Sequence, residues 1–186
     1  MQDEKIIELY WERNESAIRE TQTVYEKYLS KIIYNVLGNL QDSTECLNDT
    51  YFRIWNSIPP NRPAVFSTYI GKIARETAID AYRKQNRSKR KPTEYTLALD
   101  EISECVSGRE NTEKAVESKI LGKEISSYLR TVSEDKRTVF IMRYYYADSV
   151  KDISEQMNMS ESKVKGILHR MRKGLKKHLE KEGFEI

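Results

Sequence analysis

A chain of 186 residues has room for one domain or for two small ones. Charged residues make up 33% of it and hydrophobic residues 38%, with only seven Gly and four Pro, which favours helices over a turn-rich β fold. No stretch is long and apolar enough to span a membrane, and the first residues lack the basic start and apolar core of a signal peptide, so we expect a cytoplasmic protein.

The net charge of +3 conceals an uneven distribution along the chain. Residues 1–60 carry ten acidic and six basic side chains, whereas residues 61–91 carry nine basic and two acidic ones. This local excess predicts a surface that faces a polyanion. Cys46 and Cys105 lie far apart with no CxxC pair, so we expect reduced thiols and no metal site.

Apolar residues at helical spacing predict four helices in the first half of the chain. They span residues 3–10, 17–37, 43–57 and 66–84. Gly38 is a natural stop for the second helix, and Asp42 and Ser43 are natural caps for the third. The proline-rich stretch 58–63 ends the third helix and predicts a stiff, extended loop.

Two of these helices carry notable charges. Glu45, Asp49 and Arg53 share an outward face of the third helix, which on the residues alone favours an internally paired surface. The fourth helix has a basic side and runs into residues 83–91, six of which are basic. A frayed, solvated helix end is the alternative, but aromatic and basic residues on one helix followed by such a tail fit nucleic-acid contact better.

Between residues 92 and 111 the periodicity weakens, which predicts an interdomain linker, although Leu97, Leu99 and Ile102 could dock locally. Helical periodicity resumes at residue 112 and continues to residue 130, and Ser133 is placed to cap the helix that follows. The predicted fold is all-α, with two small helical domains of four helices each joined by the linker.

The stretch 149–179 predicts a helix-turn-helix, with a short helix, a break and a longer helix. Asn158 can adopt the left-handed conformation that ends the first helix, and Ser160 can cap the second. Six apolar residues at helical spacing form the inner face of the second helix: Val164, Ile167, Leu168, Met171, Leu175 and Leu179.

The outer face of this last helix carries seven basic residues and no acid between residues 163 and 177. A recognition helix needs apolar anchors inside, small or polar residues at its start to reach base edges, and basic residues to hold phosphates. A solvated basic face on an ordinary surface helix is the alternative. The attached helix-turn-helix pattern favours DNA binding.

Four blocks, in this order, resemble bacterial sigma factors of the extracytoplasmic-function type, which retain only sigma regions two and four. DSTECLNDTYFRIW at residues 42–55 is similar to the acidic helix that docks on the polymerase clamp, and residues 66–84 to the helix after the promoter-recognition loop. Residues 132–154 resemble the start of region four, and residues 157–179 its recognition helix. The resemblance covers nearly the whole chain.

The chain also departs from the family pattern. Asn48-Asp49 replaces a common Gln-Glu with shorter side chains, and Thr21-Gln22 replaces an apolar-aromatic pair. Ser133 stands for a frequent Pro and Asn158 for a frequent Gly, and both can do the same local job. Residues 58–63 are not general to the family and mark a subgroup.

The resemblance implies a promoter-specificity subunit without catalytic activity or cofactor, with region two at residues 1–91, a linker at 92–111 and region four at 112–186. Its implied partners are core RNA polymerase, promoter DNA and an anti-sigma factor, without membrane insertion. The implied polymerase-docking residues are Asp42, Glu45, Asn48, Asp49 and Arg53. Those for the minus-ten element are Asn61, Arg62, Ser67, Lys72, Arg75, Arg83, Lys84 and Arg87. Those for the minus-thirty-five element are Ser160, Ser162, Lys163, Lys165, His169, Arg170, Arg172 and Lys173.

Two other classes compete with this interpretation. A DNA-binding regulator that never joins polymerase would explain the C-terminal half but leave residues 42–84 without a purpose. A nucleic-acid enzyme would need clustered carboxylates, a His pair or a nucleophile with a base. The two histidines, His169 and His178, lie on the basic helix, and neither has a nucleophile or a metal-ligand partner in the sequence pattern.

Overall fold

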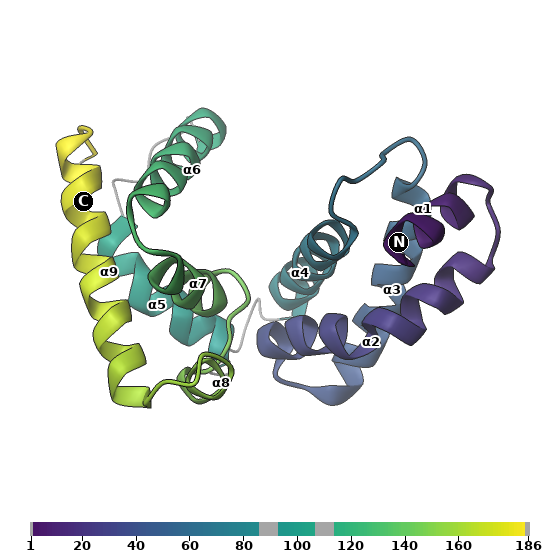
Figure 1. The fold of residues 1–186 in the computed structure, drawn as a ribbon, viewed down its shortest axis with the longest axis horizontal. Coiled ribbons are helices and arrows are strands. Elements are labelled where there is room, and N and C mark those ends of the chain that lie inside the picture. Colours follow the sequence, from purple (N-terminus) through teal and green to yellow (C-terminus); the bar gives the residue numbers. More distant parts are fainter. Residues whose placement is uncertain (1, 86–92, 107–113, 185–186) are drawn as a thin grey trace. The chain divides into compact units, whose positions relative to one another are not determined.

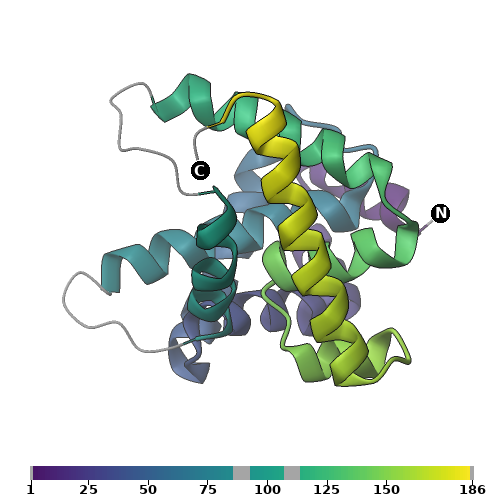
Figure 2. The same cartoon turned by 90° about the vertical axis from the view of Figure 1, so that its left-hand side faces the viewer.

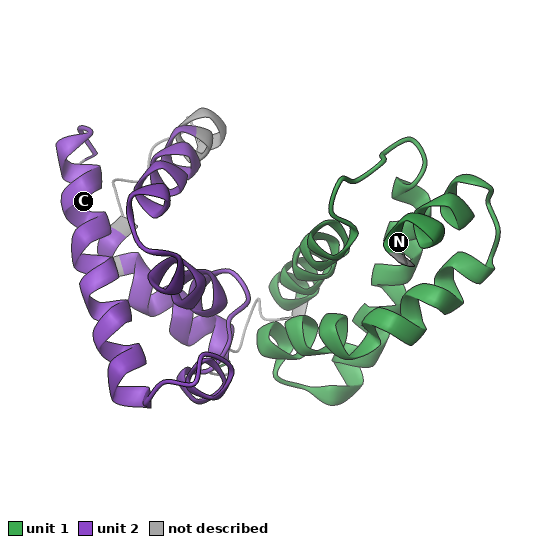
Figure 3. Ribbon diagram, in the orientation of Figure 1, with its two compact units in different colours: residues 1–93 green, residues 94–186 purple. Residues whose placement is uncertain are grey.

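The computed structural model describes residues 2–85, 93–106 and 114–184, and within those ranges all regular secondary structure is helical (Figures 1 and 2). The contacts divide the chain into two compact units, residues 1–93 and residues 94–186 (Figure 3).

The first unit is a bundle in which the second helix contacts the other three. Its helices are α1 (Gln2–Trp11), α2 (Ser16–Leu37), α3 (Leu40–Ser57) and α4 (Phe66–Gln85). Gly38 ends α2 in the left-handed conformation, at φ 64°, as predicted. The hydroxyls of Tyr10 and Thr21 are hydrogen-bonded at 2.9 Å in the core, which explains how the polar Thr21 is accommodated there.

The start of α3 differs from the prediction. The helix begins at Leu40, and its cap is Asn39, whose side-chain Oδ1 accepts from the backbone N–H groups of Gln41 at 2.9 Å and Asp42 at 3.3 Å. Asp42 and Ser43, the predicted caps, therefore lie inside the first turn. Ser43 is buried there because its place in the helical register faces the core.

The second unit is organised around its last helix, which contacts the other four helices of the unit in the described residues (Figures 1 and 2). The helices are α5 (Glu94–Val106), α6 (Lys114–Thr131), α7 (Glu134–Tyr144), α8 (Val150–Gln156) and α9 (Glu161–Lys181). All six apolar residues predicted for the inner face of α9 are buried, with Val139 and Phe140 of α7 and Ile153 of α8 in the same core.

Helix α5 occupies much of the predicted linker, so the described part of this unit has five helices where the sequence predicted four. Its buried stripe is Tyr95, Ala98 and Cys105, at helical spacing. Ile102 packs on the core, as the sequence allowed, whereas Leu97 and Leu99 are 45% and 44% exposed. Residues 94–106 are therefore a structural part of the second unit.

The helix-turn-helix forms as predicted. Asn158 adopts the left-handed conformation, at φ 51°, two residues after α8 ends. The Ser160 Oγ accepts from the backbone N–H of Lys163 at 3.2 Å and so caps α9. Ser133 occupies the cap position of α7 but makes no side-chain cap hydrogen bond.

Candidate functional site

The outward side of α3 is a mixed acidic, polar and aromatic surface. Glu45, Asn48, Asp49, Phe52 and Asn56 are all exposed, and their spacing places them on one side of the helix. We call these five residues the α3 outer face. Phe52 is 67% exposed at its centre. An exposed aromatic ring among polar residues is typical of an interaction surface.

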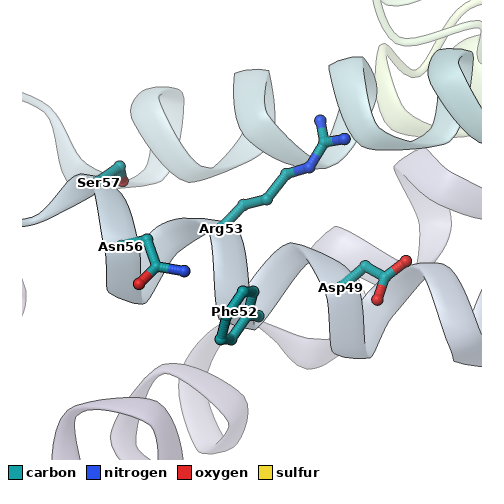
Figure 4. Close-up of a pocket in the computed structure, with 5 residues that line it drawn as sticks. All are labelled: Asp49, Phe52, Arg53, Asn56 and Ser57. Carbon is teal, nitrogen blue, oxygen red and sulfur yellow. The ribbon is translucent and has the colours of Figure 1, made fainter.

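Arg53 borders this face and turns away from it. Figure 4 shows the Arg53 side chain pointing away from the Phe52 ring. Its guanidinium Nη1 lies 3.0 Å from the Oδ2 of Asp80 on α4, so the exposed ion pair links two helices instead of running along α3. A hollow of about 430 Å³ beside it is lined by Asp49, Phe52, Arg53, Asn56 and Ser57. Asp42, the remaining predicted docking residue, is half-buried in the first turn of α3.

The loop of residues 58–65 joins α3 to α4 and is fastened at several points. The side-chain amide of Asn61 donates to the carbonyl of Ser57 at 2.9 Å, and the Arg62 guanidinium pairs with Glu8 of α1. The Cζ of Arg62 also lies 5.9 Å from the centre of the Trp11 ring. The two predicted base-capture residues are therefore exposed but held in place.

Residues of α1, and Arg13 just after it, also contact this loop and the residues beside it. The guanidinium of Arg13, just after α1, lies 5.0 Å from the centre of the Trp55 ring and donates to the Trp55 carbonyl at 2.8 Å and the Ile58 carbonyl at 3.5 Å. The buried Tyr10 ring lies 6.0 Å from Trp55 and 6.1 Å from Phe66, centre to centre. The residues on both sides of the loop thus pack against α1.

The other predicted minus-ten residues lie on α4. Lys72, Arg83 and Lys84 are exposed, and Lys72 is 3.8 Å from Glu76 in an i,i+4 pair. Ser67 and Arg75 are half-buried. Arg87 lies outside the described residues. Helix α4 therefore presents cations after the loop, in the order that the sequence predicted.

The outer face of α9 presents most of the residues predicted for the minus-thirty-five element. Those exposed are Ser160, Ser162, Lys163, Lys165, His169, Arg170 and Lys173. Lys165 makes an exposed pair with Glu161 at 3.6 Å, an interaction that contributes little. The helix thus offers small and polar groups at its start and cations along its length.

Arg172 differs from these residues, because a carboxylate of α5 holds it. Its Nη1 lies 3.1 Å from the Glu101 Oε2 and donates to the Tyr144 hydroxyl at 2.6 Å. Only 21% of the Arg172 side chain is exposed. The structure therefore places this predicted DNA contact in an internal network, where it does not point outward with its neighbours.

Arg143 of α7 is at the centre of that network and is 3% exposed. Its guanidinium lies 2.7 Å from Glu94 and 2.6 Å from Glu101, and it donates to the Asp148 carbonyl at 2.9 Å. Burial by itself lowers the pKa of the Arg143 guanidinium, but the hydrogen bonds to Glu101 and Glu94 and the attraction of their charges together outweigh it and leave the pKa raised. The cation stays charged, and it ties α5 to the second unit.

The roles of Phe52, Trp11 and the Arg143 network were not predicted from the sequence. Phe52 had a detectable signal, since it is apolar but lies outside the buried stripe of α3. The contacts of Trp11 and Arg143 join residues more than forty positions apart, for which the spacing of residues gives no signal.

In the part of the chain that the structure describes, no group of three or more His, Cys, Asp or Glu is arranged to hold a metal ion. None of the described helices is both long enough and apolar enough to cross a membrane.

The sequence also matches models of known protein families. Residues 23–88 match the family model for sigma-70 region 2, and residues 122–175 match that for sigma-70 region 4. Together these matches cover more than half of the chain, in the order of the two units.

Whole-chain relatives point the same way. The chain is 27% identical over 176 residues to the ECF RNA polymerase sigma factor SigW of Bacillus subtilis, covering 89% of this chain and 90% of that protein. It is 28% identical over 165 residues to SigX of the same organism, covering 86% and 83%. It is 21% identical over 156 residues to SigE of Mycolicibacterium smegmatis, covering 83% and 58%. The chain therefore belongs to the extracytoplasmic-function sigma factors, non-enzymatic RNA polymerase subunits that bind DNA through region 4 and initiate transcription at specific promoters.

Proposed function

We propose that this sigma factor docks on core RNA polymerase through the α3 outer face. The observation that carries the proposal is the exposed Phe52 ring between Asp49 and Asn56, beside a hollow. Aromatic residues at the centre of an interface often supply most of its binding energy, while acidic neighbours select a basic partner surface. The fitting partner is a basic polymerase surface with an apolar pocket.

The test is copurification of the full chain with core polymerase. Phe52→Ser and Asp49→Arg should each weaken the complex at least about thirtyfold, because loss of a central anchor costs about 2 kcal/mol or more. Leu40→Ser is the matched control, since Leu40 is 76% exposed on the same helix but points away from this face. If Phe52→Ser and Leu40→Ser both bind as wild type does, the α3 outer face is not the docking surface.

We assign minus-ten base capture to residues 61–67. The loop is fastened before DNA arrives, by Asn61 to Ser57 and by Arg62 to Glu8, which lowers the ordering cost of binding. Base flipping costs a few kcal/mol, and a preorganised site can offset it. Exchanging residues 61–67 for those of a relative should change minus-ten preference and leave minus-thirty-five preference unchanged. An unaltered promoter preference after the exchange would count against the assignment.

We assign minus-thirty-five reading to the exposed residues of the first half of α9. Loss of a base contact removes about 1–3 kcal/mol of discrimination, whereas loss of a phosphate contact weakens all sequences alike and lowers the salt slope by about one. Lys163→Ala and Arg170→Ala should therefore shift the selected sequence. Lys176→Ala, later on the same helix, should reduce affinity without shifting it. The measurement is promoter selection with holoenzyme at two salt concentrations, and the reverse pattern would refute the assignment.

Arg172 is left out of the base-reading set, because Glu101 and Tyr144 already hold its guanidinium. An anti-sigma factor is a further proposed partner, and it would have to compete with core polymerase for the chain. Displacement of the chain from such a partner by added core polymerase tests this. Because its main partner transcribes DNA in the cytoplasm, we place the protein there.

A further inference from the structure

Helix α1 lies outside the region 2 match, which begins at residue 23, and yet side chains of α1 and of Arg13, just after it, contact the loop of residues 58–65. Glu8 holds Arg62, and Arg13 holds the carbonyls of Trp55 and Ile58. An N-terminal helix that served only to cover the core would not need these polar contacts to an exposed loop. The contacts indicate that α1 takes part in what the loop does.

Trp11, the last residue of α1, is 39% exposed beside this loop. Its ring has the Arg62 guanidinium near it, at 5.9 Å from Cζ to ring centre. Val65, at the other end of the loop, is 58% exposed. An accessible aromatic ring next to a cation is the combination that binds single-stranded nucleic acid, because a base stacks on the ring and the cation stays close to the backbone.

We propose that Trp11 of α1 is a base-stacking residue for the separated non-template strand, adjacent to the base captured by residues 61–67. This inference rests on the proposed minus-ten function of that loop. Glu8 and Arg13 are positioning residues. They contact Arg62 and the Ile58 carbonyl and so hold the loop beside the Trp11 ring. The surface thus extends beyond the matched region, onto the N-terminal helix.

The local charge makes it possible to distinguish a base stacked on Trp11 from a phosphate bound beside it. The Glu8 carboxylate offsets the charge of Arg62, so electrostatic attraction at this point is weak and stacking has to supply the affinity. A phosphate contact would give a contribution that falls steeply with salt, whereas a stacked base gives one that changes little. The contribution of Trp11 to promoter opening should therefore be nearly independent of salt concentration.

The first experiment measures promoter opening by holoenzyme, through permanganate reactivity of unpaired thymines. Trp11→Leu should lower the opening equilibrium about five- to a hundredfold at both low and high salt, since stacking of one base on an aromatic side chain is of that order. Trp11→Phe, which keeps a ring, should restore most of it. Tyr34→Leu removes an aromatic ring on α2 that is 49% exposed and should leave opening unchanged. Circular dichroism confirms that each variant is folded.

The second experiment uses the wild-type chain and so does not depend on a variant folding. Single 5-iodouracil bases are placed along the non-template strand of the minus-ten region, and open complexes are irradiated. Cross-linking of one position to the peptide that contains Trp11 supports the inference. Opening with no such cross-link, and with full activity of Trp11→Leu, overturns it while leaving loop capture intact.

Two further outcomes also decide the matter. If Trp11→Leu lowers holoenzyme formation and not opening, the ring contacts polymerase and the inference is wrong. If wild-type holoenzyme opens promoters but exchange of residues 61–67 changes no base preference, the proposed loop function fails, and the inference that rests on it fails too.

Discussion

Replacing Glu101 by glutamine would remove the negative charge on which three side chains of the second unit converge. The Glu101 carboxylate lies 2.6 Å from the Nη2 of Arg143 and 3.1 Å from the Nη1 of Arg172, and it accepts from the Tyr144 hydroxyl at 3.1 Å. Glutamine has nearly the same shape, but it is neutral and its amide would turn donors towards two guanidinium groups. The variant therefore tests charge and hydrogen bonding with little change in volume.

The expected loss of stability depends on the contacts that Arg143 keeps in the variant. Removing one partner of a buried ion pair costs about 3–5 kcal/mol when the other charge is left alone. Here Glu94 still lies 2.7 Å from Arg143, and the Glu101 side chain is 31% exposed, so water can compensate in part. We therefore expect a loss of about 2–3 kcal/mol, which at a urea slope of about 1–3 kcal/mol/M lowers the unfolding midpoint by about 0.7–3 M.

The chain carries an internal reference for this measurement. Both of its tryptophans, Trp11 and Trp55, lie in the first unit, so tryptophan fluorescence follows that unit while far-ultraviolet circular dichroism follows both. Glu101→Gln should lower the midpoint of the dichroism transition and leave the fluorescence transition in place. Glu180→Gln, exposed on α9, is the control and should change stability by less than about 0.5 kcal/mol. If both variants give the wild-type dichroism curve, apolar packing alone holds α5.

Gly174→Ala should destabilise the second unit, because an added Cβ would lie 2.3 Å from the Tyr128 hydroxyl. At Gly122 an added Cβ has no neighbour within 4 Å, so Gly122→Ala should stabilise α6 by up to about 1 kcal/mol. Thermal melts of both variants test these two predictions. Burial is the main cause that raises the pKa of three tyrosines to about 12: Tyr25, Tyr51 and Tyr144. Because the folded pKa lies above the ordinary tyrosine value of 10.0, stability should be intact below pH 10 and fall as the pH rises from there towards 12. Absorbance at the phenolate band should show these groups ionising late. Burial, aided by the charge of Asp49, raises the pKa of the Cys46 thiol to about 11. A thiol reagent at pH 8 should therefore modify Cys46 far more slowly in the native chain than in the unfolded one. Equal rates in the two states would contradict the burial of this thiol.

Helices with large aliphatic residues at regular spacing were predictable from the sequence. The inner face of α9 is the clearest case, since all six predicted residues are buried and the turn residues Asn158 and Ser160 adopt the expected roles. Here local propensity and the tertiary core favour the same structure.

Helix α5 was missed for a physical reason. Its conspicuous leucines, Leu97 and Leu99, are the exposed residues, while the buried stripe is made of Tyr95, Ala98 and Cys105, which are small or ambivalent in hydrophobicity. Charged residues that appear to mark a linker, such as Glu101, are in fact the ones that bind Arg143. An ion pair across more than forty residues leaves no periodic signal in the sequence.

The same distinction, between local spacing and contacts among distant residues, applies to the candidate sites. The exposed cations of α9 follow from the helical register, and the resemblance predicted the loop and the docking helix as sites. Neither source indicated that Arg172 is held by α5 or that α1 fastens Arg62, because both depend on contacts between distant segments. Only the fold therefore shows which of these side chains are available to a partner.

The burial of Arg143 also constrains the order in which evolution can change this region. If the carboxylates of Glu94 and Glu101 are lost first, a guanidinium that is 3% exposed is left without its counter-charges, which is strongly destabilising. If the arginine is replaced first by an apolar residue of similar size, the two carboxylates, 37% and 31% exposed, can turn to water, and such a replacement is often neutral. Descendants of this chain should therefore keep the acids of α5 for as long as they keep the arginine, and lose the arginine before the acids.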